Sequence, residues 1–285
     1  MDDPAADTEA ASAPASAEPL GRVGGFLRGT TRQLHDSWKL LHHLIAFGLI
    51  TLGLVFRKSP LDRGLLARET LGHLTRLALR LLPLILVLSL GLGFVVIGQT
   101  VSLLNRVGAE NWLGTVMVAT VVREIGPLLT ALIMLARSGT ANVIELRTAR
   151  AREDVRSLEV SGVDPIQYLA VPRVLALAIG CFALSMYLIL GTVLSGYLWA
   201  FLEDVPLLPG RYFSQLVEAL HPIDFVMLIG KTLCFGTIIA LVTSYHGLRR
   251  LRSDEVASAA VRAVGQCILL FMITELGFLL FYLAL

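Results

Sequence analysis

The chain has 285 residues, of which 55% are hydrophobic and 16% are charged, and its mean hydropathy is +0.72. Soluble domains average about 45–50% apolar and about 25% charged residues, so this composition excludes a soluble enzyme or binding module. The length allows one all-α integral membrane domain with little mass outside the bilayer, and the net charge of +2 excludes nothing by itself.

Residues 1–20 are rich in Ala, Pro and Ser and contain five acidic residues and no basic residue. A secretory signal peptide has a positively charged start and an apolar centre, so this segment is the opposite of one. Its composition predicts a disordered N-terminal tail. We therefore expect the first membrane helix to direct insertion.

Residues 21–80 are predicted to form an amphipathic helical segment at the cytoplasmic membrane interface. The apolar stretch 40–56 has 17 residues, the lower limit for a span, and basic residues flank it on both sides. A spanning helix would place one of those basic clusters outside, so residues 38–56 are predicted to lie in the interface, with a sixth span as the alternative. Ser59 and Pro60 then supply the N-cap and first position of a helix over 60–80.

Five later stretches are predicted to span the membrane: 81–104, 112–141, 174–202, 223–245 and 263–285. The first has 24 residues without a formal charge, and its roughly 36 Å of helix crosses a hydrocarbon core of about 30 Å. Basic residues are concentrated before the first span, between the second and third, and between the fourth and fifth. Loops rich in Lys and Arg stay in the cytoplasm, which predicts a cytoplasmic N-terminus and an external C-terminus.

A charged helix is predicted over about 143–162, between the second and third spans. Apolar residues form a stripe along it, and Arg150 and Asp154 have the spacing of an ion pair on one helix. Gly162 can end this helix, and Asp164 with Pro165 supplies the N-cap and first position of the next. Such a helix suits docking of a cytosolic partner, and a merely solvated connector is the alternative. The residues expected to dock are Glu145, Arg147, Arg150, Glu153, Asp154, Leu158 and Glu159.

Four ionisable residues lie inside predicted spans: Arg123, Glu124, Lys231 and Glu275. At 1.5 Å per residue, all four fall about 12–16 Å from the outer face. A charge within a span costs at least about 2.5–3.5 kcal/mol, so such residues normally face a partner or a cavity. The group is therefore either a structural salt-bridge cluster or the polar lining of a pathway for a lipid headgroup.

Within this group, Lys231 and Glu275 are predicted to pair, because the fourth and fifth spans are joined by a short loop. Arg123 is then the candidate for a lipid phosphate, since a guanidinium binds phosphate bidentately. Pro127 removes a backbone hydrogen bond one turn beyond Glu124 and is predicted to kink the second span.

The triplet Gly230-Lys231-Thr232 resembles the end of a phosphate-binding loop, but Phe225 stands where that motif needs glycine. The triplet also lies inside an apolar helix, so we expect no ATP site in this chain. The three cysteines lie in apolar runs without CxxC spacing, which favours core packing over a disulfide or a metal site.

At these residues the chain resembles the MlaE-type permease family, the membrane subunits of ABC transporters that act on lipids together with MCE proteins. The similarity covers about residues 65–285 and is most specific in the centre of the chain. The residues that carry it are Gln99, Arg123, Glu124, Gly126, Pro127, Arg137, Gly139, Glu145, the run 162–165, Pro172, Arg173, Lys231 and Glu275.

The resemblance implies a permease that moves phospholipid or a related lipid between the bacterial inner membrane and a periplasmic MCE-domain protein. A separate cytosolic ABC ATPase would bind ATP, so this chain would be no enzyme and would hold no cofactor. Two copies, or one copy and a paralogue, would be needed, because ABC transporters pair two membrane halves. Substrate binding is expected of Arg123, Glu124, Lys231, Glu275 and Gln99, and structural roles of Pro127, Gly162, Asp164, Pro165, Pro172 and Arg173.

Two stretches on the cytoplasmic side depart from the family pattern. Residues 145–149 read Glu-Leu-Arg-Thr-Ala where the family usually has Glu-Leu-Gly-x-Met, and residues 252–258 replace a glycine-rich loop. Both lie where the ATPase would dock, so the resemblance leaves the identity of that ATPase open.

The residues alone leave two other classes open. An ion-coupled secondary transporter or channel would use Glu124, Lys231 and Glu275 as a titratable relay and would need no ATPase. A membrane scaffold without transport would tolerate substitution of all four intramembrane charges.

Overall fold

The computed structural model describes residues 46–54, 63–109, 112–202, 209–249 and 256–284. The contacts within the chain divide it into two compact units, Met1–Ala46 and Phe47–Leu285, and the second unit is described below. The predicted tail (1–20) and most of the 38–56 segment lie outside the described residues. The described part of that segment, 46–54, is helical, and the Phe47 ring packs edge-on against that of Tyr245 at 5.9 Å between centroids.

Within the described residues, five helices are long and apolar enough to cross a membrane. They cover Gly64–Leu104, Leu113–Ala151, Ile166–Leu202, Pro222–Leu248 and Ser258–Leu283. The predicted all-α fold with five spans is therefore confirmed.

The first span is a continuous helix made of α2 (Arg63–Leu92), the π-helical η1 (Gly93–Ile97) and α3 (Gly98–Arg106). The helix predicted over 60–80 continues into the span without a break, although Pro83 lies inside it. At 41 residues this span is about 60 Å long, twice the thickness of the hydrocarbon core. The basic half before Leu81 therefore extends beyond the core.

The second span alternates α-helix with π-helix. It consists of α4 (Leu113–Met117), η3 (Val118–Ile125), α5 (Gly126–Met134), η4 (Leu135–Gly139) and α6 (Thr140–Ala151). Pro127 is accommodated by the wide turn before it, where Gly126 donates its N–H to the carbonyl of Val121, five residues back. A π turn gives the proline ring more room than an α turn would, and it keeps the backbone hydrogen-bonded.

The helix predicted over 143–162 is divided in two. α6 ends at Ala151, and α7 (Asp154–Val160) begins after Glu153, whose φ is +60°. A left-handed residue breaks the helical register. The spacing of Arg150 and Asp154 predicted that they lie one turn apart on a single helix, and the structure instead places them on two helices.

The turn after α7 forms as predicted. Gly162 has a φ of +76°, and the N–H of Val163 donates to the carbonyl of Leu158 at 3.0 Å. Asp164 then caps the next helix, its Oδ1 accepting the N–H of Ile166 at 2.9 Å.

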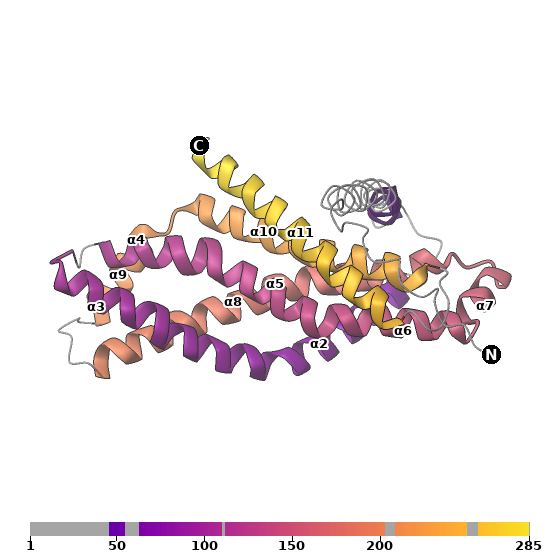
Figure 1. The fold of residues 1–285 in the computed structure, drawn as a ribbon, viewed down its shortest axis with the longest axis horizontal. Helices are drawn as coiled ribbons and strands as arrows, with labels where there is room; N and C mark the ends of the chain where they lie inside the picture. Colours follow the sequence, from indigo (N-terminus) through magenta and orange to yellow (C-terminus); the bar gives the residue numbers. More distant parts are fainter. Residues whose placement is uncertain (1–45, 55–62, 110–111, 203–208, 250–255, 285) are drawn as a thin grey trace, which may run out of the picture. The chain divides into compact units, whose positions relative to one another are not determined.

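The third span, η5 (Ile166–Ala170) with α8 (Val171–Leu202), lies at the centre of the unit. α8 packs along α2 on one side and along α10 (Pro222–Leu248) on the other (Figure 1). The contact with α10 is close at Gly236, where a Cβ would come within 2.6 Å of the Cα of Ala178. Only glycine lets the two backbones approach this far.

A cluster of buried apolar residues anchors α9 (Pro209–Ala219) to the ends of the first three spans. It includes Tyr212, whose hydroxyl donates to the carbonyl of Val193 at 3.0 Å. Burial raises the pKa of Tyr212, so the phenol stays protonated and keeps this bond.

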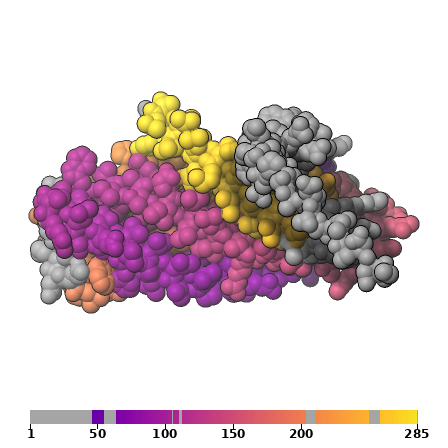
Figure 2. All heavy atoms as spheres, in the orientation of Figure 1, coloured from indigo at the N-terminus to yellow at the C-terminus, as the bar shows by residue number. Residues whose placement is uncertain are grey.

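The last helix, α11 (Val256–Leu283), is the least buried of the five spans. Only 11% of its most apolar stretch is covered, and it packs on α10 and α6. Figure 2 shows its side chains standing along one face of the molecule.

Candidate functional site

Lys231 lies in α10, and its ammonium group bonds to two other spans. It donates to Oε2 of Glu124 at 3.1 Å and to the backbone carbonyl of Arg123 at 2.8 Å. It also forms an ion pair with Glu275 of α11, so the predicted Lys231–Glu275 pair is present. The ammonium therefore makes two hydrogen bonds to the second span and an ion pair with the fifth. Glu124 is the exposed member, since 49% of its side chain is accessible against 5% for Lys231.

Arg123 is held by a carboxylate that the sequence reasoning missed, that of Asp224. Nε of Arg123 forms an ion pair with Oδ1 at 2.8 Å, and Nη2 donates a hydrogen bond to Oδ2 at 3.1 Å, so both carboxylate oxygens contact the guanidinium. Oδ2 also accepts the N–H of His221, so one carboxylate both caps α10 and pairs with the arginine. Nη1 of Arg123 donates to the hydroxyl of Tyr282, and the guanidinium carbon lies 4.5 Å from the centre of that ring.

The two missed residues carried a usable signal. Asp224 lies seven positions before Lys231, and Tyr282 lies seven positions after Glu275. Seven residues are about two helical turns, so each pair shares one helix face. The sequence alone does not single out Asp224, because a carboxylate in the first turn of a helix normally caps that helix and faces water.

The group encloses a small cavity with an apolar wall. Its volume is about 50 Å³, and Met227, Leu228, Phe278 and Leu279 form the apolar wall. A water takes roughly 30 Å³, so the cavity has room for a water or two and not for a phospholipid headgroup. Two cations, Arg123 and Lys231, face three carboxylates, which leaves one negative charge in excess.

Gln99 does not join this group. It is exposed on α3 and lines a different cavity, together with Phe94, Arg106 and Trp199. Its predicted role in substrate binding therefore stays a prediction, separate from the ion-pair group.

The sequence model of a family described as Permease MlaE matches residues 70–281, which include every charged residue of the group. The chain belongs to the MlaE permease family. A probable ABC transporter permease protein of Rickettsia prowazekii is 31% identical over 227 residues, which cover 78% of this chain and 86% of the relative. The chloroplastic protein TRIGALACTOSYLDIACYLGLYCEROL 1 of Arabidopsis thaliana is 28% identical over 221 residues, or 74% of this chain and 62% of the relative. A probable ABC transporter permease protein of Synechocystis is 34% identical over 146 residues, or 50% and 53%.

In this MlaE permease the residues predicted to dock a partner separate into two sets. Arg147 is buried and donates from Nε to the carbonyl of His246 at 3.3 Å, while Glu145 lies 3.6 Å from Arg173. Arg147 is therefore packed within the membrane domain, whereas the Glu145 side chain is 51% exposed. The others lie near the break between α6 and α7, with Glu153, Asp154 and Glu159 exposed and Arg150 and Leu158 half-buried.

The predicted structural residues lie at turns and helix starts of the MlaE permease. Pro165 precedes η5 and Pro172 is buried near the start of α8. Arg173 donates from Nη1 to the carbonyl of Leu169 at 2.7 Å. Among the cysteines, Cys181 and Cys267 are buried as expected, but Cys234 is exposed, because it lies on the outward face of α10.

Proposed function

We propose that this chain is the membrane subunit of an ABC transporter that moves phospholipid or a related lipid between the bacterial inner membrane and a periplasmic MCE-domain protein. Family membership and the relatives that are named as probable ABC transporter permeases support the transporter class. The Arabidopsis relative is named after trigalactosyldiacylglycerol, which is a lipid, and this name supports a lipid cargo. ATP hydrolysis takes place on a separate ATPase that docks at α7, and two permease copies, or one copy and a paralogue, complete the membrane part. The N-terminus is cytoplasmic and the C-terminus periplasmic.

The observation that carries this proposal is the ion-pair group inside an apolar helix bundle. Charges in a span are costly, and replacing such a group with apolar residues is often neutral or stabilising for folding alone. The group is instead placed where it can be opened, because Glu275 and Tyr282 lie on α11, the least buried span. Movement of α11 away from α10 would widen the 50 Å³ cavity and expose charges to a headgroup.

The charge balance further favours a zwitterionic headgroup over an anionic one. The fork of Arg123 is occupied by Asp224, but Nη1 and Nη2 each retain one N–H for a phosphate oxygen. Glu124 is half-exposed and can accept the ammonium of a phosphatidylethanolamine. An anionic headgroup would instead add a second negative charge to a group that already has one in excess.

A site-specific photocrosslinker tests this proposal. A benzoylphenylalanine at Leu279, which lines the cavity, should capture phosphatidylethanolamine in preference to phosphatidylglycerol from nanodiscs that contain equal amounts of both. The change Glu124→Gln, which leaves the buried Arg123–Asp224 pair in place, should reduce that capture at least about fivefold, because a charged hydrogen bond is worth about 1.5–3 kcal/mol. The control position is Leu194, which is 60% exposed on α8, and it should capture both lipids equally in either background.

If Leu279 captures the two lipids equally and the charge change has no effect, the ion-pair group does not bind headgroups and is only a structural salt-bridge cluster. The partners are tested separately, by purifying the tagged permease from native membranes. An ATPase and an MCE-domain chain should copurify, and lipid transfer should require ATP. Transfer that stops when the proton gradient collapses, with ATP still present, would identify an ion-coupled transporter instead.

A further inference from the structure

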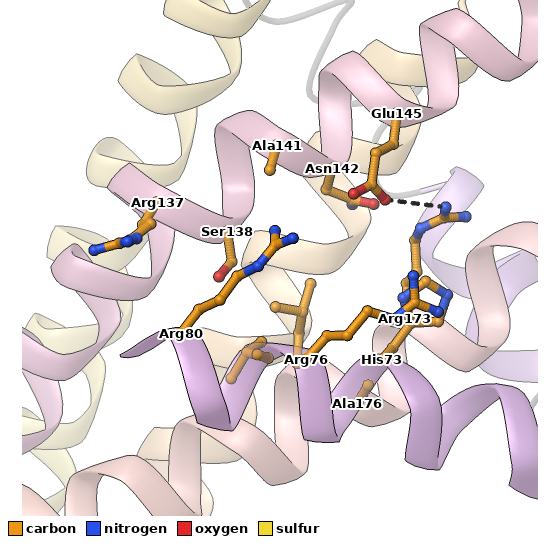
Figure 3. A pocket seen from close by; sticks show the side chains of 12 residues that line it. His73, Arg76, Arg80, Arg137, Ser138, Ala141, Asn142, Glu145, Arg173 and Ala176 are labelled. Atoms are coloured by element: carbon orange, nitrogen blue, oxygen red, sulfur yellow. Dashed lines mark ion pairs between the residues drawn. The ribbon is translucent and has the colours of Figure 1, made fainter. Parts of the chain in front are cut away.

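A second polar cavity lies between α2, the end of the second span and α8, and shares no residue with the ion-pair group (Figure 3). Its volume is about 300 Å³, at the lower end of the range of small-molecule sites, roughly 300–1,000 Å³. The charged and titratable residues that line it are His73, Arg76, Arg80, Arg137, Glu145 and Arg173. Its floor is apolar and includes the buried Leu77 and Leu177.

The cavity lies near the end of the hydrocarbon core. Arg80 directly precedes the charge-free stretch that begins at Leu81. Arg137 follows Glu124 by 13 residues on the same span, which places it about 20 Å farther along the helix axis. The cavity therefore belongs to the side of the membrane that holds α7, which the orientation proposed above makes the cytoplasmic leaflet.

The lining has a large excess of positive charge. Four guanidinium groups face a single carboxylate, that of Glu145, and the nearest contact between them, to Arg173, is 3.6 Å long. Figure 3 shows the Arg173 guanidinium directed at Glu145, with Arg76 extending from α2 toward Arg173 and His73 and Arg80 extending toward Ser138. Like charges gathered in this way repel one another unless an anion lies between them.

Donor groups in the cavity also lack acceptors. The Arg173 side chain is only 11% exposed, and its Nε is buried without a hydrogen-bond partner. Arg80 and Arg137 are exposed, and within the part of the chain that the structure describes they have neither a hydrogen bond nor an ion pair. The buried Nε–H of Arg173 costs free energy without an acceptor, and the exposed guanidinium groups beside it have donors to spare, so the cavity is suited to a ligand rich in acceptor oxygens.

We infer that this cavity binds a phosphate group, and that its source is the headgroup of an anionic phospholipid in the adjacent leaflet. A phosphodiester offers charged oxygens that guanidinium groups bind in a fork. The apolar floor and the position beside the hydrocarbon core suit the glycerol and the start of the acyl chains. The assignment to the cytoplasmic leaflet rests on the proposed orientation. The binding site itself does not depend on the transport function proposed for the ion-pair group.

Native mass spectrometry of the full chain in detergent tests the inference. The protein is titrated with phosphatidylglycerol, phosphatidylcholine or diacylglycerol, and in a separate arm with inorganic phosphate. The variant combines Arg76→Gln and Arg80→Gln, which removes two exposed guanidinium groups and leaves the Glu145–Arg173 pair in place. The matched control combines Arg68→Gln and Arg106→Gln, which removes the same charge from exposed positions outside the cavity.

Wild-type protein and the control should bind phosphatidylglycerol alike and more tightly than phosphatidylcholine, while diacylglycerol, without phosphate, should not bind at the site. The cavity variant should bind phosphatidylglycerol at least about tenfold more weakly, since each hydrogen bond to a charged group is worth about tenfold or more. If inorganic phosphate binds in an arginine-dependent way and the lipid does not, the phosphate comes from solution and the lipid source is wrong. Equal phosphatidylglycerol affinity in wild type and variant, or an equal loss in the control, would overturn the site.

Two further measurements keep the test decisive. If the double variant fails to fold, Arg80→Gln alone removes a side chain that has no partner among the described residues, and it should still weaken lipid binding severalfold. Photocrosslinking at Leu279 should be unchanged in these variants, so failure of this inference is distinguishable from failure of the proposed transport function.

Discussion

Removing one member of the Arg123–Asp224 pair should destabilise the protein far more than removing both. The Asp224 side chain is 1% exposed and that of Arg123 is 22% exposed. Breaking a buried ion pair from one side costs about 3–5 kcal/mol, because the remaining charge loses its compensation. Arg123→Gln leaves the more deeply buried charge alone, so it should cost about 4–5 kcal/mol.

The reverse change, Asp224→Asn, should cost less, about 3 kcal/mol. The amide oxygen can still accept the His221 N–H, and the Arg123 guanidinium keeps its contact with the Tyr282 ring. In the double variant two neutral amides face each other, and the total loss should fall short of the sum of the single losses by about 3 kcal/mol.

Equilibrium unfolding in mixed micelles, with increasing sodium dodecyl sulfate and helicity followed by circular dichroism, measures these differences. Glu218→Gln changes an exposed carboxylate on α9 and should stay within about 0.5 kcal/mol of wild type. A coupling free energy below about 0.5 kcal/mol would show that the pair does not act as a unit. A larger loss for Asp224→Asn than for Arg123→Gln would refute the argument from relative burial.

The remaining predictions concern other parts of the fold. Lys231→Ala leaves both Glu124 and Glu275 without their cation, so it should reduce the yield of folded protein more than Glu275→Ala does. Size-exclusion chromatography measures this yield, and the opposite order would contradict the contacts at Lys231. Gly236→Ala should destabilise by about 1–3 kcal/mol because its Cβ meets the α8 backbone, whereas Gly265→Ala, with no atom within 4 Å of its Cβ, should be neutral or stabilising by up to about 1 kcal/mol. Asp154→Arg with Glu159→Arg should abolish stimulation of the ATPase while melting stays normal, whereas Arg147→Ala, at a buried position, should lower the melting temperature. With the exposed Cys234 changed to Ser, a cysteine at Val107 should react with an impermeant thiol reagent outside intact cells and one at Ser157 should not; the reverse result would invert the orientation.

The five spans and the Lys231–Glu275 pair could be predicted from sequence because their signals are local. A charge-free stretch such as 81–104 has few alternatives to a span. Spans that a short loop joins are neighbours, and one basic and one acidic residue at the same depth have few other partners.

The rest depended on packing that local patterns do not encode. The break at Arg152 and Glu153 contains neither glycine nor proline, so nothing in the sequence indicates the left-handed residue. Asp224 has the position of an ordinary helix cap, and only the approach of the second span shows that it is also the partner of Arg123. Arg76, Arg80, Arg137 and Arg173 each lie near the end of a span, where basic residues are expected for orientation. They share a cavity because α2 and the second span both pack along α8.

The π-helical segment η3 (Val118–Ile125) carries both Arg123 and Glu124. This affects how firmly the directions of their side chains about the helix axis are fixed. A π turn holds about one residue more than an α turn, so moving it along the span by a few residues rotates the intervening side chains by about 100°. Every backbone N–H can keep an acceptor during such a shift, and the hydrocarbon core therefore does not oppose it. Backbone hydrogen bonding thus leaves the rotation of Arg123 and Glu124 undetermined. It is set by the position of Pro127 and by tertiary contacts, among them the Ile189 side chain against Gly126 and the bonds of Arg123 and Glu124 with Asp224, Tyr282 and Lys231.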